Sequence, residues 1–265
     1  MKINSSCSLK ENVLAMIYGE KNTKLVVLGH QKSGTTVIGN LISKATGLSY
    51  SNDPTYAVKV GDSEIINQFY HSPSSFNSLS KSKKSFFYQQ IVKDPEFTLN
   101  FELVEKLYPN ADFVFIARSP HQTIRSIFNR LKLDGTLDSQ HVKVSDMYNG
   151  NQLWSFILNG EENDYTVVEN LARRIEKCTE NYLENKDKMY LVRYEDFVKN
   201  KSESIFQIVN DLSLEKKYDI DSFVDIQYQP KGHIETDLNK FFGNKNYQKI
   251  ANLCPKTMEA FSYTH

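Results

Sequence analysis

Residues 24–42 read KLVVLGHQKSGTTVIGNLI. The run Leu25–Leu28 is continuously apolar, which is typical of a strand buried on both faces. Gly29 ends this run, and apolar residues then recur at helical spacing, so we expect a helix to begin at Gly34 or Thr35. A strand, a glycine-bounded loop and a helix N-terminus together direct backbone N–H groups at an anion, most often a phosphate. The stretch therefore predicts a phosphate-binding loop in an α/β protein.

The loop departs from the Walker A pattern G-x-x-x-x-G-K-[ST] at the position where a nucleotide kinase carries its lysine. Gly29 and Gly34 have the Walker A separation, but Thr35 follows the second glycine. The lysine lies inside the loop instead, at Lys32. Such a loop keeps the phosphate cradle and loses the ammonium group that reaches the β- and γ-phosphates of ATP. A P-loop kinase is the enzyme alternative, and a structural turn is the alternative without a ligand.

Length and composition indicate an ordinary globular protein. The chain has 265 residues, of which 40% are hydrophobic and 24% are charged. We expect a single domain over residues 1–265, with residues 1–23 as an N-terminal extension or helix. The formal net charge is zero. Bulk electrostatics therefore give no reason to expect a nucleic-acid partner.

Cysteine usage and hydropathy bear on the cellular compartment. Cys7, Cys178 and Cys254 are far apart and outside metal-ligand spacing, so we expect reduced thiols and no metal site. Residues 1–23 contain no apolar core long enough for a signal peptide, and no later stretch is apolar enough to span a bilayer. These features favour a cytoplasmic protein or a soluble form of a membrane-anchored enzyme.

Apolar runs alternate with helical patterns along the rest of the chain, which predicts a central parallel sheet flanked by helices. The further strands are expected at residues 85–92, 112–117 and 188–193, and the further helices at 97–107, from Pro120, at 165–183 and at 202–212, with a short extended piece and turn at 49–54. Residues 71–85 are rich in serine and lysine. We expect them to form a solvated surface loop, or a mobile cover whose Lys81, Lys83 and Lys84 meet an anionic substrate. Residues 132–146 are expected to form another loop over the site.

Four side chains are expected to gather at one edge of this sheet. Ligands of parallel α/β sheets bind at the carboxyl ends of the strands. Lys93, Arg118 and Tyr194 end or follow predicted strands, and Lys32 lies in the loop after the first strand. Their coincidence predicts one shared site.

The loop segment Lys32–Thr36, KSGTT, resembles the first signature of the sulfotransferases, although Gln31 stands where most members have proline. Residues 113–130, FVFIARSPHQTIRSIFNR, and residues 191–197, LVRYEDF, are similar to two further recurrent stretches of that family. The resemblance covers most of the chain. It implies a P-loop-like α/β fold and an enzyme that moves the sulfuryl group of 3′-phosphoadenosine 5′-phosphosulfate (PAPS) to an acceptor hydroxyl.

The branch that contains the tyrosylprotein and carbohydrate sulfotransferases is the most similar one. It has K-D-P and F/Y-P-N-A segments, which match residues 93–95 and 108–111 here. It also has L-S-K-W followed by a glycine, where residues 238–243 read LNKFFG. The match places Lys240 near the cofactor phosphates, residues 229–234 in a closing loop and residues 225–265 in a segment that covers the cofactor.

The resemblance implies a cofactor-binding set drawn from all these stretches. Arg118 would grip the 3′-phosphate with its guanidinium, assisted by Ser126 and Arg130 on the next helix. Tyr194 would contact the adenine. The full set is Lys32, Ser33, Gly34, Thr35, Thr36, Arg118, Ser126, Arg130, Tyr194 and Lys240.

Sulfuryl transfer, like phosphoryl transfer, relies mainly on positioning and electrostatic stabilisation. The resemblance implies that Lys32 neutralises the leaving group, adenosine 3′,5′-bisphosphate, and that Lys93 contacts the sulfuryl oxygens. Family members use a histidine or a glutamate as general base, and the position that matches the glutamate here holds Asp53. The alternative bases are His71, Glu64 and Glu96.

A hydroxyl of a carbohydrate or glycolipid is the expected acceptor. Aromatic residues make up 12% of the chain and sugars stack on aromatic faces, whereas an acidic peptide would favour a basic groove that a neutral chain does not indicate. A peptide tyrosine and a small alcohol or phenol are the alternative acceptors. A non-catalytic module that binds the bisphosphate is the alternative outside the enzymes, and a homodimer is left open.

Overall fold

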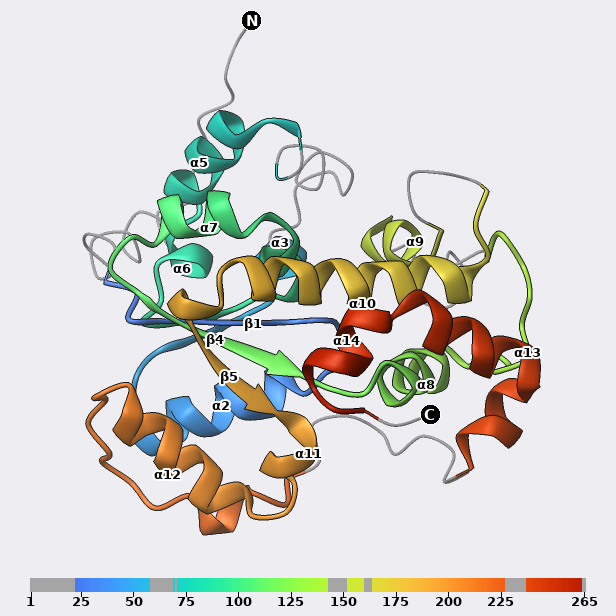
Figure 1. The fold of residues 1–265 in the computed structure, drawn as a ribbon. Helices are drawn as coiled ribbons and strands as arrows, with labels where there is room; N and C mark the ends of the chain where they lie inside the picture. Colours follow the sequence, from blue (N-terminus) through green and yellow to red (C-terminus); the bar gives the residue numbers. More distant parts are fainter. Residues whose placement is uncertain are drawn as a thin grey trace, which may run out of the picture.

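A five-stranded parallel sheet lies at the centre of the molecule (Figure 1). The computed structural model describes residues 22–57, 69, 71–142, 152–159, 164–226 and 237–263. The strands run in the order β2-β3-β1-β4-β5, and every neighbouring pair is parallel. Their bounds are β1 Leu25–Gly29, β2 Tyr50–Asn52, β3 Ile91–Lys93, β4 Asp112–Ala117 and β5 Met189–Arg193. The predicted α/β fold with a central parallel sheet is confirmed.

Helices cover both faces of the sheet (Figure 1). On one face α2 (Thr35–Thr46) lies beside α12 (Lys201–Asp211), and α10 (Val167–Glu184) and α7 (Phe101–Leu107) cover the other. The remaining elements are α3 Pro54–Ala57, α5 Pro73–Ser82, α6 Lys84–Phe87, η1 Pro95–Asn100, α8 Pro120–Leu131, α9 Gln152–Asn159, η2 Lys186–Lys188, α11 Tyr194–Phe197, η3 Asp221–Phe223, α13 Leu238–Leu253 and α14 Pro255–Ala260.

Strand β1 is apolar on both sides because both of its faces are buried. Val26 and Leu28 pack into the core under α10 and α7, whereas Leu25 and Val27 pack into the core under α2 and α12. All four side chains have no exposed surface. The alternation follows from the period of two along a strand, and it explains why the sequence shows a continuous apolar run at this point.

The carboxyl ends of the strands meet at one edge of the sheet. In the register, Val27 lies opposite Lys93, and Ala117 lies opposite Arg193. The chain leaves this edge through the glycine loop after β1, through Asp94 after β3 and through Arg118 after β4. The predicted convergence of these segments is therefore present.

The prediction for residues 71–92 is wrong in two places. The expected surface loop contains helix α5, which begins with Pro73 at its first turn and buries Phe76. The expected strand over residues 85–92 is instead α6 followed by the three residues of β3. Phe76 and Phe87 meet edge to face, with ring centroids 5.6 Å apart. Packing of these rings in the core, which local composition does not report, decides the structure here.

The expected helix over residues 97–107 is also divided. The chain forms the 3-10 helix η1 first, and the α-helix α7 starts only at Phe101. Asp94 accounts for the early start, because its side chain accepts a hydrogen bond from the backbone N–H of Glu96 and caps η1.

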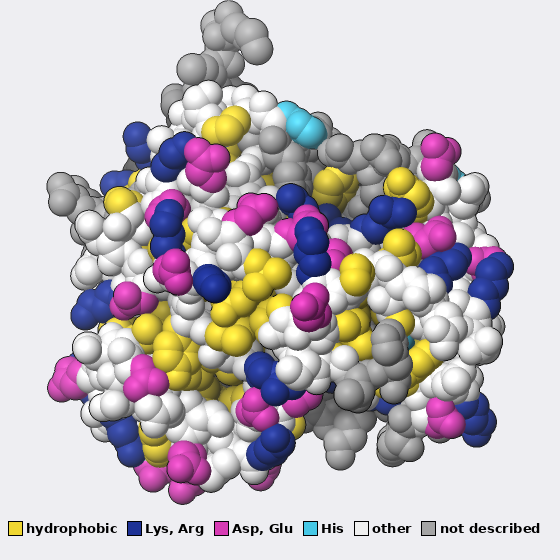
Figure 2. All heavy atoms as spheres, viewed as in Figure 1, with side chains coloured by type: hydrophobic (Ala, Val, Ile, Leu, Met, Phe, Trp, Pro, Cys, Tyr) yellow, Lys and Arg dark blue, Asp and Glu magenta, His cyan; other side chains and the backbone are white. Residues whose placement is uncertain are grey.

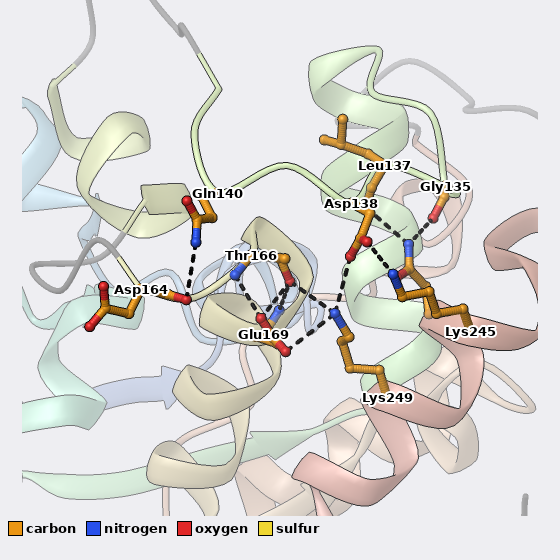
Figure 3. A network of polar contacts seen from close by, with 10 residues as sticks. Gly135, Leu137, Asp138, Gln140, Asp164, Thr166, Glu169, Lys245 and Lys249 are labelled. Atoms are coloured by element: carbon orange, nitrogen blue, oxygen red, sulfur yellow. Dashed lines mark hydrogen bonds and ion pairs between the residues drawn. The ribbon is translucent and has the colours of Figure 1, made fainter.

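The loop predicted for residues 132–146 is described as far as residue 142, and this part is irregular as expected. Polar contacts bind it to two helices (Figure 3). The Asn246 side-chain amide donates hydrogen bonds of 3.0 Å to the carbonyls of Gly135 and Leu137. Asp138 pairs with Lys245 and Lys249 of α13, and Lys249 also pairs with Glu169 of α10. We call Asp138, Glu169, Lys245 and Lys249 the strap network.

The surface mixes charges of both signs. On the face shown in Figure 2, Lys and Arg side chains alternate with Asp and Glu side chains around hydrophobic stretches. This distribution agrees with the formal net charge of zero. Among the described helices, none combines the length and the apolar character that crossing a membrane requires.

Candidate active site

The loop between β1 and α2 has an unusual backbone. Gly29 and Gly34 have φ angles of 140° and 107°, and Lys32 has a φ angle of 68°. A Cβ atom on Gly34 would lie 2.3 Å from the Tyr194 ring, and one on Gly29 would lie 2.8 Å from the carbonyl oxygen of Ile116. Both glycines are therefore required, by the positive φ and by the close approach of neighbours.

Side chains from distant elements hold this loop in place. The Gly29 N–H donates a hydrogen bond of 2.8 Å to the Thr98 hydroxyl, which donates back to the Gly29 carbonyl at 3.1 Å. The Gln31 side-chain amide donates to the carboxylate of Glu96, and Arg174 of α10 donates to the same carboxylate at 2.8 Å. Gln31 thus anchors the loop through its side chain at the position where most sulfotransferases have proline.

A cleft of about 250 Å³ opens beside the loop. One part of its lining is cationic and another is carboxylate-bearing, and α9 adds an apolar side. The cleft residues are Gln31, Lys32, Thr35, Thr36, Asn52, Asp53, Thr55, Lys93, Asp94, Pro95, Glu96, Arg130, Trp154 and Ile157. Of the predicted catalytic residues, Lys32, Asp53 and Lys93 all lie in it.

Positive charge is concentrated around Lys32. Burial and, in decreasing order of size, the charges of Arg130, Arg118 and Lys93 together lower the pKa of the Lys32 ammonium to about 8. A cationic group whose protonated form is disfavoured by burial and by other cations is stabilised when an anion binds. The electrostatics of the cleft therefore favour a multiply charged anion.

Asp53 carries the carboxylate that pairs with Lys93, one of these cations. Its side chain pairs with the Lys93 ammonium at 2.6 Å, and the side chain of Lys93 is only 2% exposed, against 28% for Asp53. The Asp53 backbone has a φ angle of 52°, and its N–H donates to the Lys93 carbonyl at 2.7 Å. A non-glycine residue held in the left-handed region is a local strain of the kind that collects at functional sites.

Asp94 is a cleft residue that sequence reasoning did not assign to the site. Its carboxylate accepts hydrogen bonds from the backbone N–H and the hydroxyl of Thr55, at 2.9 and 2.6 Å, as well as from the N–H of Glu96. Burial, followed by the negative charge of Asp53, raises the pKa of the Asp94 carboxyl to about 7. The Asp-Pro-Glu sequence at a helix start was the available signal, because aspartate is a preferred N-cap.

The three alternative bases differ in whether they line the cleft. Glu96 lies in the cleft, but its side chain is 1% exposed and is held by Arg174 and Gln31. His71 is exposed and is not part of the cleft lining. Glu64 lies outside the described residues, as do residues 229–234, which were expected to close over the cofactor.

Arg118 and Tyr194 form a second layer behind the loop. The Arg118 guanidinium donates to the Lys32 carbonyl at 2.8 Å and lies over the Tyr194 ring, 4.4 Å from its centroid. The Tyr194 ring in turn packs against Gly34. These contacts connect the carboxyl ends of β4 and β5 to the loop that follows β1.

The other predicted cofactor residues are placed as follows. Ser126 is half-buried on α8, and Arg130 is one turn further along the same helix and reaches the cleft. Ser33 is buried behind the loop and is not part of the cleft lining. Lys240 is exposed in the first turn of α13 and is also not part of that lining.

A sequence profile of the sulfotransferase family matches residues 51–218, which is more than half of the chain. The chain belongs to the sulfotransferase family. The predicted family and enzyme class are thereby confirmed. A search of curated proteins gives no match to this sulfotransferase.

Solved sulfotransferase structures share the fold of this chain at low sequence identity. STF9 from Mycobacterium avium matches with a TM-score of 0.58 and 12% identity, over 96% of this chain and 80% of that chain. Mouse SULT7A1, complexed with PAP, matches with a TM-score of 0.52 and 14% identity, over 98% and 94%. The sulfotransferase domain from the curacin biosynthetic pathway matches with a TM-score of 0.52 and 13% identity, over 93% and 99%. These likenesses concern the fold.

Proposed function

We propose that this sulfotransferase transfers the sulfuryl group of PAPS to a hydroxyl group of a carbohydrate. The observation that carries the proposal is the meeting of Lys32, Lys93 and Arg130 with the carboxylate of Asp53 in one cleft beside the glycine loop. Such a cleft offers charge for an anionic donor and a proton acceptor for a hydroxyl, side by side. The structural likeness to mouse SULT7A1, a complex with PAP, agrees with this choice of cosubstrate.

The residues around the loop fit a bound phosphate. Gly34 is the N-cap of α2 and places no side chain over the helix N-terminus. The dipole of this 12-residue helix adds to the charge of Lys32. In this proposal Lys32, Gly34, Thr35 and Thr36 hold the 5′-phosphate end, with Ser33 shaping the loop from behind.

The residues proposed to hold the 3′-phosphate and the adenine lie on α8 and at the carboxyl ends of β4 and β5. Arg118 and Arg130 bring guanidinium groups suited to a phosphate monoester, and Ser126 adds a hydroxyl on the same helix as Arg130. Tyr194 offers an aromatic face for the adenine. Lys240 is assigned to the cofactor through the sequence resemblance.

The chain's own residues would then perform the chemistry around the sulfuryl group that the bound cosubstrate supplies. Asp53 takes the proton of the acceptor hydroxyl on its carboxylate, which its left-handed backbone holds at the cleft. Lys32 and Lys93 place positive charge where negative charge collects during transfer. Because Lys93 is paired with Asp53, binding of an anion near Lys93 would also release the carboxylate to act as base.

A carbohydrate is the acceptor that suits the cleft lining. Trp154 and Ile157 of α9 present an apolar side, and Asn52, Asp53 and Thr55 present polar groups at the same cleft. Sugars combine an apolar ring face with hydroxyl groups, so one acceptor uses both kinds of surface. A peptide tyrosine, a small phenol and a glycolipid are the competing acceptors in the assay below.

Calorimetric titration with adenosine 3′,5′-bisphosphate, and separately with ATP and magnesium, tests the cofactor assignment. We expect wild type to bind the bisphosphate and to ignore ATP, and Arg118→Ala to lose most of that affinity. Arg173→Ala removes an exposed arginine that packs on Tyr165 instead, and serves as the matched control. Magnesium-dependent ATP binding that survives Arg118→Ala would overturn the proposal in favour of a kinase.

An acceptor panel tests the second half of the proposal. Wild type and Asp53→Asn would be incubated with PAPS and neutral oligosaccharides, glycolipids, tyrosine peptides or phenols, and products would be identified by mass spectrometry. We expect sulfated oligosaccharide from wild type and at least a hundredfold less from Asp53→Asn. Bisphosphate binding without any sulfated product would favour a non-catalytic binding module.

A further inference from the structure

A small cavity lies against the glycine loop and shares no lining residue with the cleft. Its volume is about 10 Å³. His30 and Ser33 of the loop line it together with Thr123 of α8. Thr179 and Thr257, which also line it, are hydrogen-bonded to each other through their hydroxyls at 2.7 Å.

Three polar atoms in this cavity lack a hydrogen-bond partner among the described residues: His30 Nε2, Ser33 Oγ and Thr123 Oγ1. In the described part of the chain, only six buried side-chain nitrogen or oxygen atoms lack a hydrogen-bond partner. Half of them belong to residues that line this one cavity. The three residues are 4%, 1% and 1% exposed. A buried polar group left without a partner destabilises the folded chain, so three at one place call for a common partner.

The chemistry of each atom defines what that partner must offer. His30 Nδ1 lies 2.9 Å from the Gln31 carbonyl oxygen, which only accepts, so Nδ1 carries the hydrogen and Nε2 is an acceptor. Burial and the nearby Arg174 lower the pKa of His30 to about 3, so the imidazole is neutral. The partner must donate to Nε2, while the two hydroxyls accept or donate.

We propose that this cavity is a binding site for one structural water molecule, which donates to His30 Nε2 and bonds to the hydroxyls of Ser33 and Thr123. The volume suits a single water and excludes larger ligands. Three polar partners is the usual number for a buried water. A cation is disfavoured because Arg118 lines the same cavity.

The water would connect the phosphate loop to α8. Thr123 lies one turn before Ser126 on that helix, and Arg130 follows further along it. A bridge from Ser33 to Thr123 therefore fixes the loop against the helix that carries the second set of anion-binding groups. This consequence for cofactor affinity rests on the proposed function, whereas the water site itself does not.

A crystal structure of the wild-type protein at about 1.8 Å or better tests the site directly. We expect a density peak within hydrogen-bond distance, about 2.7–3.2 Å, of all three atoms. Side chains that turn to bond each other directly, or a cavity without density among well-ordered neighbouring waters, would overturn the proposal. Thr123→Val should lose or displace the peak, and Thr123→Ser should keep it because the hydroxyl is retained.

Calorimetry on the same pair of variants tests the positioning role. We expect Thr123→Val to bind adenosine 3′,5′-bisphosphate about fivefold more weakly than wild type, the effect of one buried hydrogen bond, and Thr123→Ser to bind within about twofold of wild type. Unchanged affinity in Thr123→Val would overturn the link between the water and the loop. Absence of bisphosphate binding in wild type would instead overturn the proposed function and leave the crystallographic result standing.

Discussion

The cleft and the strap network contain charged side chains of the same kinds, but their most buried and most exposed members differ widely in exposure. In the cleft, the Lys93 side chain is 2% exposed and the Glu96 side chain is 1% exposed. In the strap network, the Lys245 side chain is 71% exposed and that of Asp138 is 38% exposed. The cleft charges also sit beside strained backbone at Lys32 and Asp53. Buried charge and strain coincide at the end of the sheet where ligands bind.

The difference has an energetic meaning. Exposed ion pairs contribute about 0–1 kcal/mol to stability, because water and salt screen them and long side chains lose entropy. Buried pairs gain little over an apolar replacement, yet losing one partner leaves the other charge in a poor environment. The strap network therefore holds residues 132–142 through ion pairs that each contribute little to stability. The cleft contains buried charges that are compensated fully only when a ligand binds. Four substitutions or titrations test this contrast.

The largest expected effect is on the free energy of unfolding, when the buried ion pair of Glu96 and Arg174 is broken. Glu96→Ala removes the carboxylate that holds Arg174 and Gln31, and should lower the free energy of unfolding by about 3–5 kcal/mol. Urea denaturation followed by circular dichroism measures it. Glu102→Ala is the matched control, because Glu102 and its partner Lys106 are 80% and 70% exposed, so this substitution should leave the free energy of unfolding almost unchanged. Equal effects of the two substitutions would contradict a tightly held buried pair.

The next effect is on catalysis. Lys32→Met should reduce the rate of sulfuryl transfer by about 10²–10³-fold, since it removes charge placed at the leaving group. Single-turnover kinetics with PAPS and the best acceptor of the panel measure it. Lys245→Met makes the same chemical change in the strap network and should leave the rate within about twofold of wild type. A Lys32→Met enzyme of near-normal rate would remove this lysine from the proposed mechanism.

The third effect concerns pH. The pKa of Lys32 is lowered to about 8, so its positive charge is lost as the pH rises through 8. We expect bisphosphate affinity to fall by roughly tenfold per pH unit at most above pH 8. The stability effect of this group has the opposite sign: between pH 8 and 10.5 the unfolded chain holds more protons, so stability increases with pH. Calorimetry from pH 7 to 9 measures the affinity, and a pH dependence that persists in Lys32→Met would assign it to another group.

The smallest effect is expected in the strap network. Asp138→Asn removes the pairs with Lys245 and Lys249 but leaves the hydrogen bonds of Asn246 to Gly135 and Leu137. The free energy of unfolding should fall by less than about 1 kcal/mol, and the loss should shrink further in high salt. If the free energy of unfolding fell by more than about 2 kcal/mol and the loss did not depend on salt, the ion pairs of Asp138 would behave as buried pairs, against this prediction.

Much of the fold and part of the site could be predicted because their signals are local. The apolar run Leu25–Leu28 and the glycines after it specify strand, loop and helix within twenty residues. Lys32, Asp53 and Lys93 were predicted as site residues and do line one cleft. The strands before Arg118 and Tyr194 were predicted as well, because each is a short apolar run that ends at a polar residue.

The misses share a physical cause, which is contact between residues far apart in sequence. Helix α5 forms in a serine-rich segment because Phe76 packs into an aromatic core shared with Phe87 and Phe97. Asp94 joins the site because it holds Thr55, 39 residues earlier in the chain. Trp154 joins it because α9 lies beside the cleft. Nothing in the local pattern around these residues reports such contacts.

The sequence by itself determined the glycine loop, the parallel α/β architecture and the sulfotransferase family, because short-range spacing fixes strand, turn and helix. Only the tertiary structure decided how the loop is held. The bond from Gln31 to Glu96 spans 65 residues and the one from Arg174 to Glu96 spans 78. It also decided which charges are buried, and therefore that the pKa of Lys32 is lowered. Burial depends on everything that packs around a residue, and that is a property of the folded chain as a whole.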